Sequence, residues 1–307
     1  MKTYQYIAGN YTYIAFSLNT DYNIHYNINT KMEDETLKEI ADFKYKEHGK
    51  DVLNNRKHSH NNCYEILQIW SGEGVVMVKN KLYPIKSGSV YFINGMDIHC
   101  SVPKNSNEYI RSKIIISSKY INKIAEFTNS FKILDALFIK SGGMCIELGQ
   151  NETAIIDEAF LKIRDNLSED TIYTSINVAT AIFEILTYAH GNINTYNPAL
   201  TNKISDVLQY INRNIENKIT LEEICNYVHV SKYYLCHIFK ETTHMTILDY
   251  ILFRRLSIAK KNLIYTDKSL ADIAMSSGFS SFSYFSRMFH VCEGVTPSAF
   301  RKTNAIQ

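Results

Sequence analysis

The last third of this 307-residue chain contains one helical pattern twice. The segment ITLEEICNYVHVSKYYLCHIF begins at Ile219, and SLADIAMSSGFSSFSYFSRMF begins at Ser269. In each copy a serine is followed by bulky residues at the same three positions: Ser231, Tyr234, Leu235 and Phe239 in the first copy, and Ser281, Tyr284, Phe285 and Phe289 in the second. The repeat therefore predicts that one small helical unit occurs twice.

Each copy is predicted to form a helix-turn-helix. Thr220, with Glu223 three residues later, forms a capping box that indicates the start of a short helix. A second helix is expected from Ser231 onward, after a turn of three or four residues. In the second copy Gly278 can adopt the left-handed conformation that a tight turn needs. A plain helical hairpin is the alternative for one unit, and the matched duplication favours the helix-turn-helix.

A long amphipathic helix is predicted between the copies, over TILDYILFRRLSIAKKNLIYT. Its apolar residues fall on one side: Ile247, Ile251, Leu256, Ala259 and Leu263. Such a helix is roughly 27 Å long. The second helices of the two units could therefore reach successive major-groove segments of DNA, about 34 Å apart, on one face of the duplex.

The charge distribution agrees with a nucleic-acid partner for the last third. Residues 200 to 307 hold 13 Lys and Arg against 9 Asp and Glu, a net charge of +4. The remainder holds 20 against 22, a net charge of −2, so the whole chain carries only +2. The basic excess lies where the repeated units lie, although an ordinary mixed surface is an alternative explanation.

The first two thirds are predicted to combine a β-barrel with flanking helices. Short apolar runs from Tyr64 to Trp70, Gly74 to Val78, Val90 to Ile93 and Tyr109 to Ser117 alternate with turn residues. Tyr11 to Leu18 is a further candidate strand, whereas residues 34 to 48 resemble a charged helix. Helical periodicity follows after Ser118, notably over residues 152 to 190. We expect an α+β chain with a sensor domain at 1–192, a linker at 193–201 and an all-helical domain at 202–307.

The cysteines and the hydropathy pattern predict a reduced, cytoplasmic protein. The six cysteines contain no CxxC pair, which argues against a zinc ribbon or a disulfide framework. No stretch approaches 18 uninterrupted apolar residues, so neither export nor membrane insertion is expected.

The last hundred residues resemble the AraC/XylS family of bacterial transcription regulators. The resemblance rests chiefly on GFSSFSYFSRMFHVCEGVTPSAFR, which begins at Gly278, and on Tyr250, Arg255 and Ala259 of the connecting helix. His244 departs from the family pattern, which usually has glycine there. The resemblance implies that the second helix of each unit enters the major groove of double-stranded DNA. The expected DNA-binding residues are Lys232, Tyr233, Cys236, His237, Phe282, Ser283, Ser286 and Arg287.

A second resemblance concerns the predicted barrel. His58, His60, Glu65 and His99, with Gly72 and Gly88, resemble the two metal-binding motifs of cupins, although Val52, Asn94 and Met96 depart from those motifs. Imidazole and carboxylate groups suit a first-row divalent ion. The preferred interpretation is a metal-free pocket for a small polar effector such as a sugar. The expected effector-binding residues are His60, Glu65, Trp70, Tyr91 and His99.

These patterns favour a non-enzymatic, effector-controlled regulator. The family resemblance further implies a homodimer formed by the helices around residues 152 to 190, contact with RNA polymerase, and activation more often than repression. The alternative is a metal-dependent cupin enzyme fused to a DNA-binding domain, with no catalytic residues assigned beyond the four possible metal ligands. A regulator gated by a protein partner or by oxidation at Cys63 or Cys100 is a third possibility.

Overall fold

The structure is a computed structural model. It describes residues 2–8, 11–17, 39–49, 62–140, 144–168, 173–192 and 202–304. His58, His60, Val52 and the expected linker at 193–201 lie outside the described residues. Among the helices that the structure describes, none is both long and apolar enough to cross a membrane.

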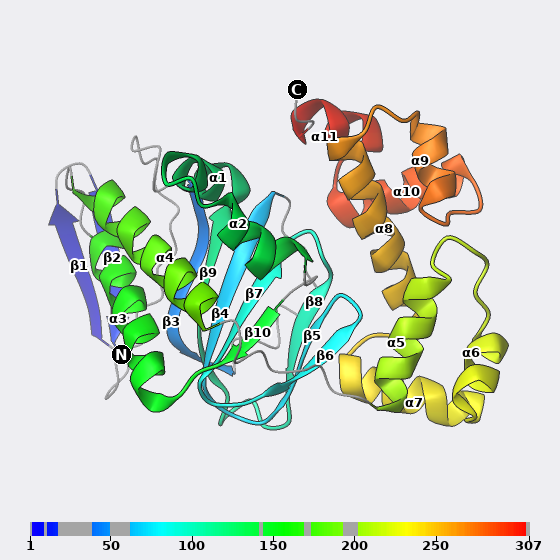
Figure 1. The fold of residues 1–307 in the computed structure, drawn as a ribbon, viewed down its shortest axis with the longest axis horizontal. Coiled ribbons are helices and arrows are strands. Elements are labelled where there is room, and N and C mark those ends of the chain that lie inside the picture. Colours follow the sequence, from blue (N-terminus) through cyan, green and yellow to red (C-terminus); the bar gives the residue numbers. More distant parts are fainter. Residues whose placement is uncertain are drawn as a thin grey trace.

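The strands of the first two thirds form antiparallel sheets (Figure 1). A five-stranded sheet has the order β10-β7-β4-β9-β3, a three-stranded sheet has the order β6-β5-β8, and β1 pairs with β2. Their bounds are β1 Lys2–Ala8, β2 Tyr11–Ser17, β3 Ile40–His48, β4 Cys63–Ser71, β5 Gly74–Val78, β6 Lys81–Ile85, β7 Ser89–Asn94, β8 His99–Pro103, β9 Ile110–Ser117 and β10 Met144–Glu147. The expected strands at Tyr11, Tyr64, Gly74, Val90 and Tyr109 are therefore confirmed.

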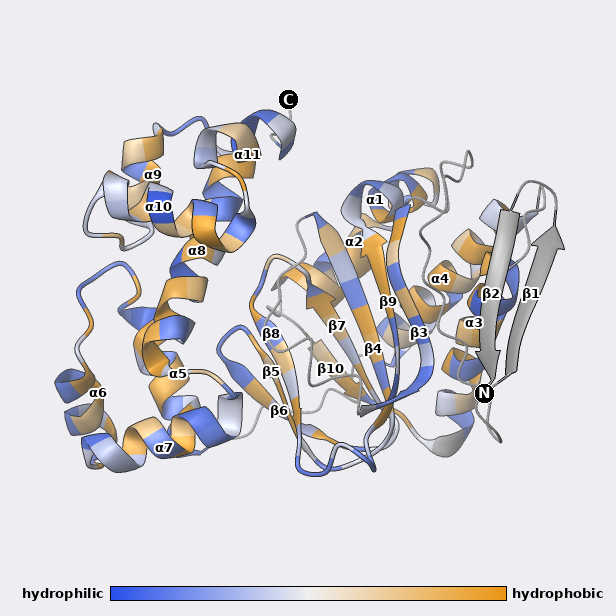
Figure 2. Cartoon of the chain, turned by 180° about the vertical axis from the view of Figure 1, so that it is seen from behind, coloured by the Kyte–Doolittle hydropathy of each residue, from blue (hydrophilic) through white to orange (hydrophobic). Residues whose placement is uncertain are grey.

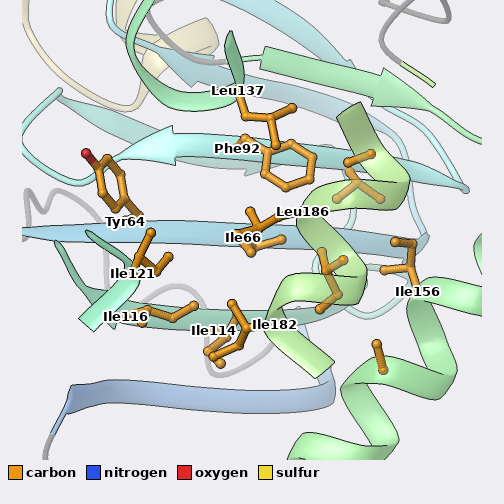
Figure 3. Close-up of a cluster of buried hydrophobic side chains, with 14 of the residues drawn as sticks. Tyr64, Ile66, Phe92, Ile114, Ile116, Ile121, Leu137, Ile156, Ile182 and Leu186 are labelled. Atoms are coloured by element: carbon orange, nitrogen blue, oxygen red, sulfur yellow. The ribbon is translucent and has the colours of Figure 1, made fainter. Parts of the chain in front are cut away.

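Helices cover one face of the five-stranded sheet. They are α1 (Ser118–Phe127), α2 (Phe131–Leu134), the π-helix η3 (Asp135–Lys140), α3 (Gln150–Leu167) and α4 (Thr174–Gly191). Alternate residues of the strands, such as Ile66 and Phe92, pack against Ile156 and Ile182 of the helices (Figure 3). Figure 2 shows much of β4, β7 and β9 in the hydrophobic colour. Period-two alternation thus gives the sheet one face for the helices and one for the second sheet.

The opposite face packs against the three-stranded sheet. Leu67, Ile69 and Tyr91 of the larger sheet share a buried cluster with Val76 and Tyr83 of the smaller one. Among the described strands, no hydrogen-bonded ladder joins the two sheets. This part of the chain is therefore a mixed α/β structure with two facing sheets.

Residues 34 to 48 correct one expectation. The predicted charged helix is wrong over its described part, because Ile40–His48 forms β3 and pairs with β9. The pairing register shifts between Ile40 and Asp42 and again between Lys44 and Glu47. These β-bulges each insert an unpaired residue, so the buried positions no longer alternate.

The last third is all-helical and has two cores that share one helix. The helices are α5 (Lys203–Arg213), α6 (Leu221–Val228), α7 (Lys232–Thr243), α8 (Ile247–Tyr265), α9 (Leu270–Ser276), α10 (Phe282–Glu293) and α11 (Pro297–Asn304). One core joins α5, α6 and α7 to the beginning of α8, and the other joins the end of α8 to α9, α10 and α11. The two predicted helix-turn-helix units and the connecting helix are confirmed.

The three-stranded sheet and the loop between β7 and β8 contact the two halves of the helical part. Met77, Leu82 and Cys100 belong to the same buried cluster as the core of the first unit. Met96, in the loop between β7 and β8, belongs to the cluster of the second unit. Tyr250 of α8 also donates a hydrogen bond to the Lys79 carbonyl oxygen, at 2.9 Å. The three-stranded sheet and the β7–β8 loop together therefore pack along α8 across the boundary between the units.

Candidate nucleic-acid interface

The second helix of the first unit is α7. Its N-cap, Ser231, accepts a hydrogen bond from the Tyr234 amide at 3.3 Å, which satisfies one of the free amides at the helix start. Leu235 and Phe239 are buried and attach α7 to the first core. The remaining face is directed away from that core.

All four expected DNA-binding residues of α7 are exposed: Lys232, Tyr233, Cys236 and His237. Tyr233 is 84% exposed, and its ring stacks on that of His237 with centroids 6.3 Å apart. The Lys232 ammonium forms an exposed ion pair with Glu222 at 3.4 Å, which is weak enough to be exchanged for a phosphate. This face offers donors and an aromatic ring to a partner.

The second unit repeats this arrangement in α10. Ser281 accepts a hydrogen bond from the Tyr284 amide at 3.2 Å, and Phe285 and Phe289 are buried in the second core. Of the expected DNA-binding residues, Phe282, Ser283 and Arg287 are exposed and Ser286 is half-buried.

Arg287 is the main cationic group expected on this face. Its guanidinium lies 5.8 Å from the centroid of the Tyr284 ring, a cation–π contact that orients the side chain while leaving its donors available. Tyr284 and the equivalent Tyr234 are themselves exposed, and the sequence reasoning did not select them. The repeated Ser-x-x-Tyr spacing is the sequence signal from which both tyrosines could have been selected.

The described effector candidates do not all meet, because Trp70 lies on the other face of the larger sheet from Glu65 and Tyr91. Glu65 and His99 come from facing sheets and meet in the interior, with Glu65 Oε2 3.0 Å from His99 Nε2. Tyr91 faces the same interior, and its hydroxyl donates to the Pro84 carbonyl oxygen at 2.5 Å. Trp70 is not brought to this group. Its indole donates to Ser112 Oγ at 2.9 Å, and the Lys46 ammonium lies 4.0 Å from its ring centroid.

The buried imidazole of His99 has an acceptor at each nitrogen. Nδ1 lies 2.7 Å from the Asp97 carbonyl oxygen, and Nε2 faces the Glu65 carboxylate. An imidazole donates from both nitrogens only when it is protonated. Burial lowers the pKa of His99, but the Glu65 charge and both hydrogen bonds outweigh burial and the nearby Lys113, so the pKa is raised. The interior thus holds a charged His99–Glu65 pair.

This pair predicts a pH dependence of stability. Between the ordinary histidine pKa of about 6.5 and the raised pKa, the folded protein binds more protons at His99 than the unfolded chain does. The free energy of unfolding should therefore fall as the pH rises through the raised pKa. Denaturant titrations at a series of pH values should show this fall in the wild type and a flatter profile in Glu65→Gln. An equal slope in both proteins would contradict the assignment.

The sequence reasoning missed two further ion pairs in the same part of the sheet. The buried guanidinium of Arg111 lies 3.2 Å from Glu47, and the buried ammonium of Lys113 lies 2.7 Å from Asp42. The signal was two cations separated by one residue and followed by three isoleucines, and strand alternation places both cations on the face opposite Ile114. They make this region more highly charged than the histidine motif alone indicated.

The possible metal site is incomplete in the described part of the chain. No group of three or more His, Cys, Asp and Glu side chains there has the geometry to hold a metal ion. Glu65 and His99 do meet, whereas His58 and His60 lie outside the described residues. As for the possible redox site, burial raises the pKa of Cys63 to about 11, with Glu39 adding to the shift. That thiol therefore stays protonated at neutral pH.

A charged contact joins the interior pair to the helical part. The Asp97 carboxylate, which is 3% exposed, lies 2.7 Å from the Lys261 ammonium and 3.8 Å from Arg254 Nη1, both on α8. In the same loop the Met96 carbonyl oxygen accepts a hydrogen bond from Ser257 at 2.7 Å. Because the Asp97 carbonyl also binds His99, one residue connects the sheet interior to the connecting helix.

Comparison with known proteins finds a family model in the helical part and relatives that are similar to part of the chain. The family model described as a helix-turn-helix domain matches residues 224–303. The regulatory protein SoxS of Escherichia coli (strain K12) is 36% identical over 98 residues, which are 32% of this chain and 92% of SoxS. The bifunctional transcriptional activator/DNA repair enzyme AdaA of Bacillus subtilis (strain 168) is 35% identical over 101 residues, 33% of this chain. The match spans 48% of AdaA, about half its length.

A solved structure is also similar to part of this chain. A transcriptional regulator from Chromobacterium violaceum, described among AraC-type DNA-binding domain-containing proteins, is 31% identical. The match covers 34% of this chain and 92% of that chain, with a TM-score of 0.32.

Proposed function

The chain belongs to the AraC family of helix-turn-helix transcription regulators, and we propose that it binds a specific double-stranded DNA site through α7 and α10. The observation that carries the proposal is the pair of capped helices, each anchored by buried apolar residues and each with an exposed outer face. Lys232, Tyr233, Cys236 and His237 serve one half-site. Phe282, Ser283, Ser286 and Arg287 serve the other. Cationic groups bind phosphates or guanine, and Phe282 contacts thymine methyl groups.

Arg287→Ala tests this proposal. The Arg287 guanidinium is exposed and contacts the Tyr284 ring, so its removal should leave the fold intact. We expect operator affinity to fall by about 1 to 3 kcal/mol, because one phosphate or guanine contact is lost. The measurement is a gel-shift titration with a duplex that the wild-type chain selects from random sequences. Unchanged affinity would remove Arg287 from the interface.

In this proposal the first two thirds of the chain regulate DNA binding. We assign residues 1–192 to a cupin-like sensor and dimerisation domain, 193–201 to the linker and 202–307 to the DNA-binding domain. The two facing sheets are the walls of the sensor, and a small polar metabolite binds at Glu65, His99 and Tyr91, together with His60. The buried charges at this location support a polar rather than an apolar effector. Trp70 is a weaker candidate, since its ring contacts Lys46 on the other face.

The same proposal includes the partners expected of such a regulator. The chain acts in the cytoplasm as a homodimer joined through α3 and α4, and as an activator that contacts RNA polymerase. The exposed apolar residues Ile155 of α3 and Ile176 of α4 support a contact there. The proposal includes no catalytic step. Stoichiometric iron, manganese or zinc in protein purified without added metal would instead favour the cupin enzyme.

A route for the effector signal follows from the contacts of Asp97. An effector that binds Glu65 or His99 competes with the His99 hydrogen bonds, one of which is to the Asp97 carbonyl oxygen. Asp97 in turn binds Lys261 and lies near Arg254 on α8. Binding energy in the sensor could thereby change how α8 is held, provided that the effector binds the two arrangements unequally.

A further inference from the structure

The two helix-turn-helix units meet at a second place besides α8. Arg255, on α8, donates from Nε to the Ile215 carbonyl oxygen at 3.0 Å and from Nη2 to the Asn217 carbonyl oxygen at 2.7 Å. Both carbonyls belong to the segment between α5 and α6, in the first unit. Arg255 therefore ties α8 to the segment that leads into the first helix-turn-helix.

The turn of the second unit packs against the same place. Gly278 lies between α9 and α10, with a φ of +88°. A Cβ at this position would overlap the Ile215 carbonyl oxygen, and it would lie 2.7 Å from Arg255 Nε and 3.1 Å from Glu216 Cα. The backbones of the two units thus approach each other closely, with the Arg255 guanidinium beside the contact. We call Ile215, Asn217, Arg255 and Gly278 the junction.

Two units joined only by a connecting helix are held less firmly than two units that also touch each other at a second place. Long helices bend gently, and apolar contacts such as that of Phe253, which packs against both cores, have no preferred direction. Two hydrogen bonds from one planar guanidinium do have a direction. At the junction, α8 binds the first unit and the turn of the second unit packs against the same segment. The junction therefore restricts rotation of one unit about α8.

We propose that Arg255 is a positioning residue that sets the spacing between the two DNA half-sites this protein accepts. The inference rests on the proposed function. Each base pair turns the major groove by roughly 35°, so inserting two base pairs between half-sites moves one of them well around the duplex. Two units held at a fixed angle cannot both contact their half-sites after this displacement, whereas units free to turn about α8 can.

The test uses the full chain and a duplex that the wild type selects from a random library, with two base pairs then inserted at each position across the selected site in turn. For the wild type, we expect insertion between the half-sites to reduce affinity by about tenfold or more, because one half-site is lost. For Arg255→Gln the loss should shrink to within about threefold, with weaker binding to the original spacing. Arg255→Lys, which keeps the charge and the stem, should lie between the two and provides a second variant should Arg255→Gln fail to fold.

Arg301→Gln is the matched control. Arg301 Nη2 donates to the Lys268 carbonyl oxygen at 2.7 Å, an arginine–carbonyl contact wholly within the second unit. This variant should keep the wild-type dependence on spacing. Arg287→Ala should lower affinity at the original spacing without widening the range of accepted spacings.

Two results would overturn the inference. One is a wild type that binds the original and expanded sites equally. The other is a pair of folded Arg255 variants that discriminate between spacings as strongly as the wild type. A wild-type chain that enriches no DNA sequence would contradict the proposed function and, with it, this inference.

Discussion

Gly278→Ala is expected to lower the free energy of unfolding by about 2 to 5 kcal/mol, the sum of two costs. The first is conformational, because φ is +88° at Gly278 and a side chain disfavours that region. The second is steric, because the new methyl group would overlap the Ile215 carbonyl oxygen of the other unit. Backbone atoms cannot swing aside as a flexible side chain can. Denaturant titration followed by helical circular dichroism measures the change.

Gly294→Ala separates the two costs. Gly294 is the C-cap of α10 with a φ of +74°, and a Cβ there would have no neighbour within 4 Å. Only the conformational cost applies, so the loss should be about 1 to 2 kcal/mol. Equal losses for the two variants would show that the two units do not approach each other at Gly278. The junction described above would then be absent in solution.

The helical third could be predicted from sequence because its signals are local. The Thr220 and Glu223 capping box is present, with the Thr220 amide 2.8 Å from the Glu223 carboxylate. Ser231 and Ser281 are both N-caps, and the apolar residues chosen for α8 are all buried. Each of these features depends on residues within one or two turns of helix, where spacing alone decides which side chains meet. The second copy of the pattern then supported the helix-turn-helix prediction made from the first copy.

The sheet region was less predictable because its β-bulges give the buried residues of a strand the spacing of a helix. In β3 the residues Ile40, Phe43 and Glu47 are buried, a spacing of three and four that is typical of a helix. The two register shifts in the pairing with β9 produce that spacing. Strands β1, β6, β8 and β10 were also missed, and the last three have only four or five residues each. Runs this short carry little periodic signal.

The proposed effector site shows what strand alternation can predict. Glu65 and Trp70 are an odd number of residues apart in β4, so a period of two places them on opposite faces, as observed. That separation was available from the sequence. The contact of Asp97 with Lys261 was not, because it joins residues 164 positions apart in the sequence. Nothing in the local pattern around Asp97 indicates which helix it will face.

Asp97→Asn is expected to lower the free energy of unfolding by about 3 kcal/mol, because it removes the negative charge between buried or half-buried cations. Arg254 is 3% exposed like Asp97 itself, while the Lys261 side chain is 32% exposed and can turn partly toward water. The Lys79 ammonium is a third cation in the group. Burial lowers the pKa of Lys79, and the charges of Arg254 and Lys261 lower it further, while Asp97 acts to raise it. Without Asp97 these cations repel one another at the contact between the β7–β8 loop and α8.

Glu73→Gln is the matched control for the loss of one carboxylate. The Glu73 carboxylate lies 2.9 Å from the Lys104 ammonium, but both side chains are about three-quarters exposed. An exposed ion pair contributes at most about 1 kcal/mol, so this variant should unfold almost like the wild type in the same denaturant titration. The buried and the exposed carboxylate should therefore differ by about 2 kcal/mol or more. If the two variants lose equal stability, Asp97 does not hold the β7–β8 loop against α8, and the proposed route from His99 to the connecting helix loses its physical basis.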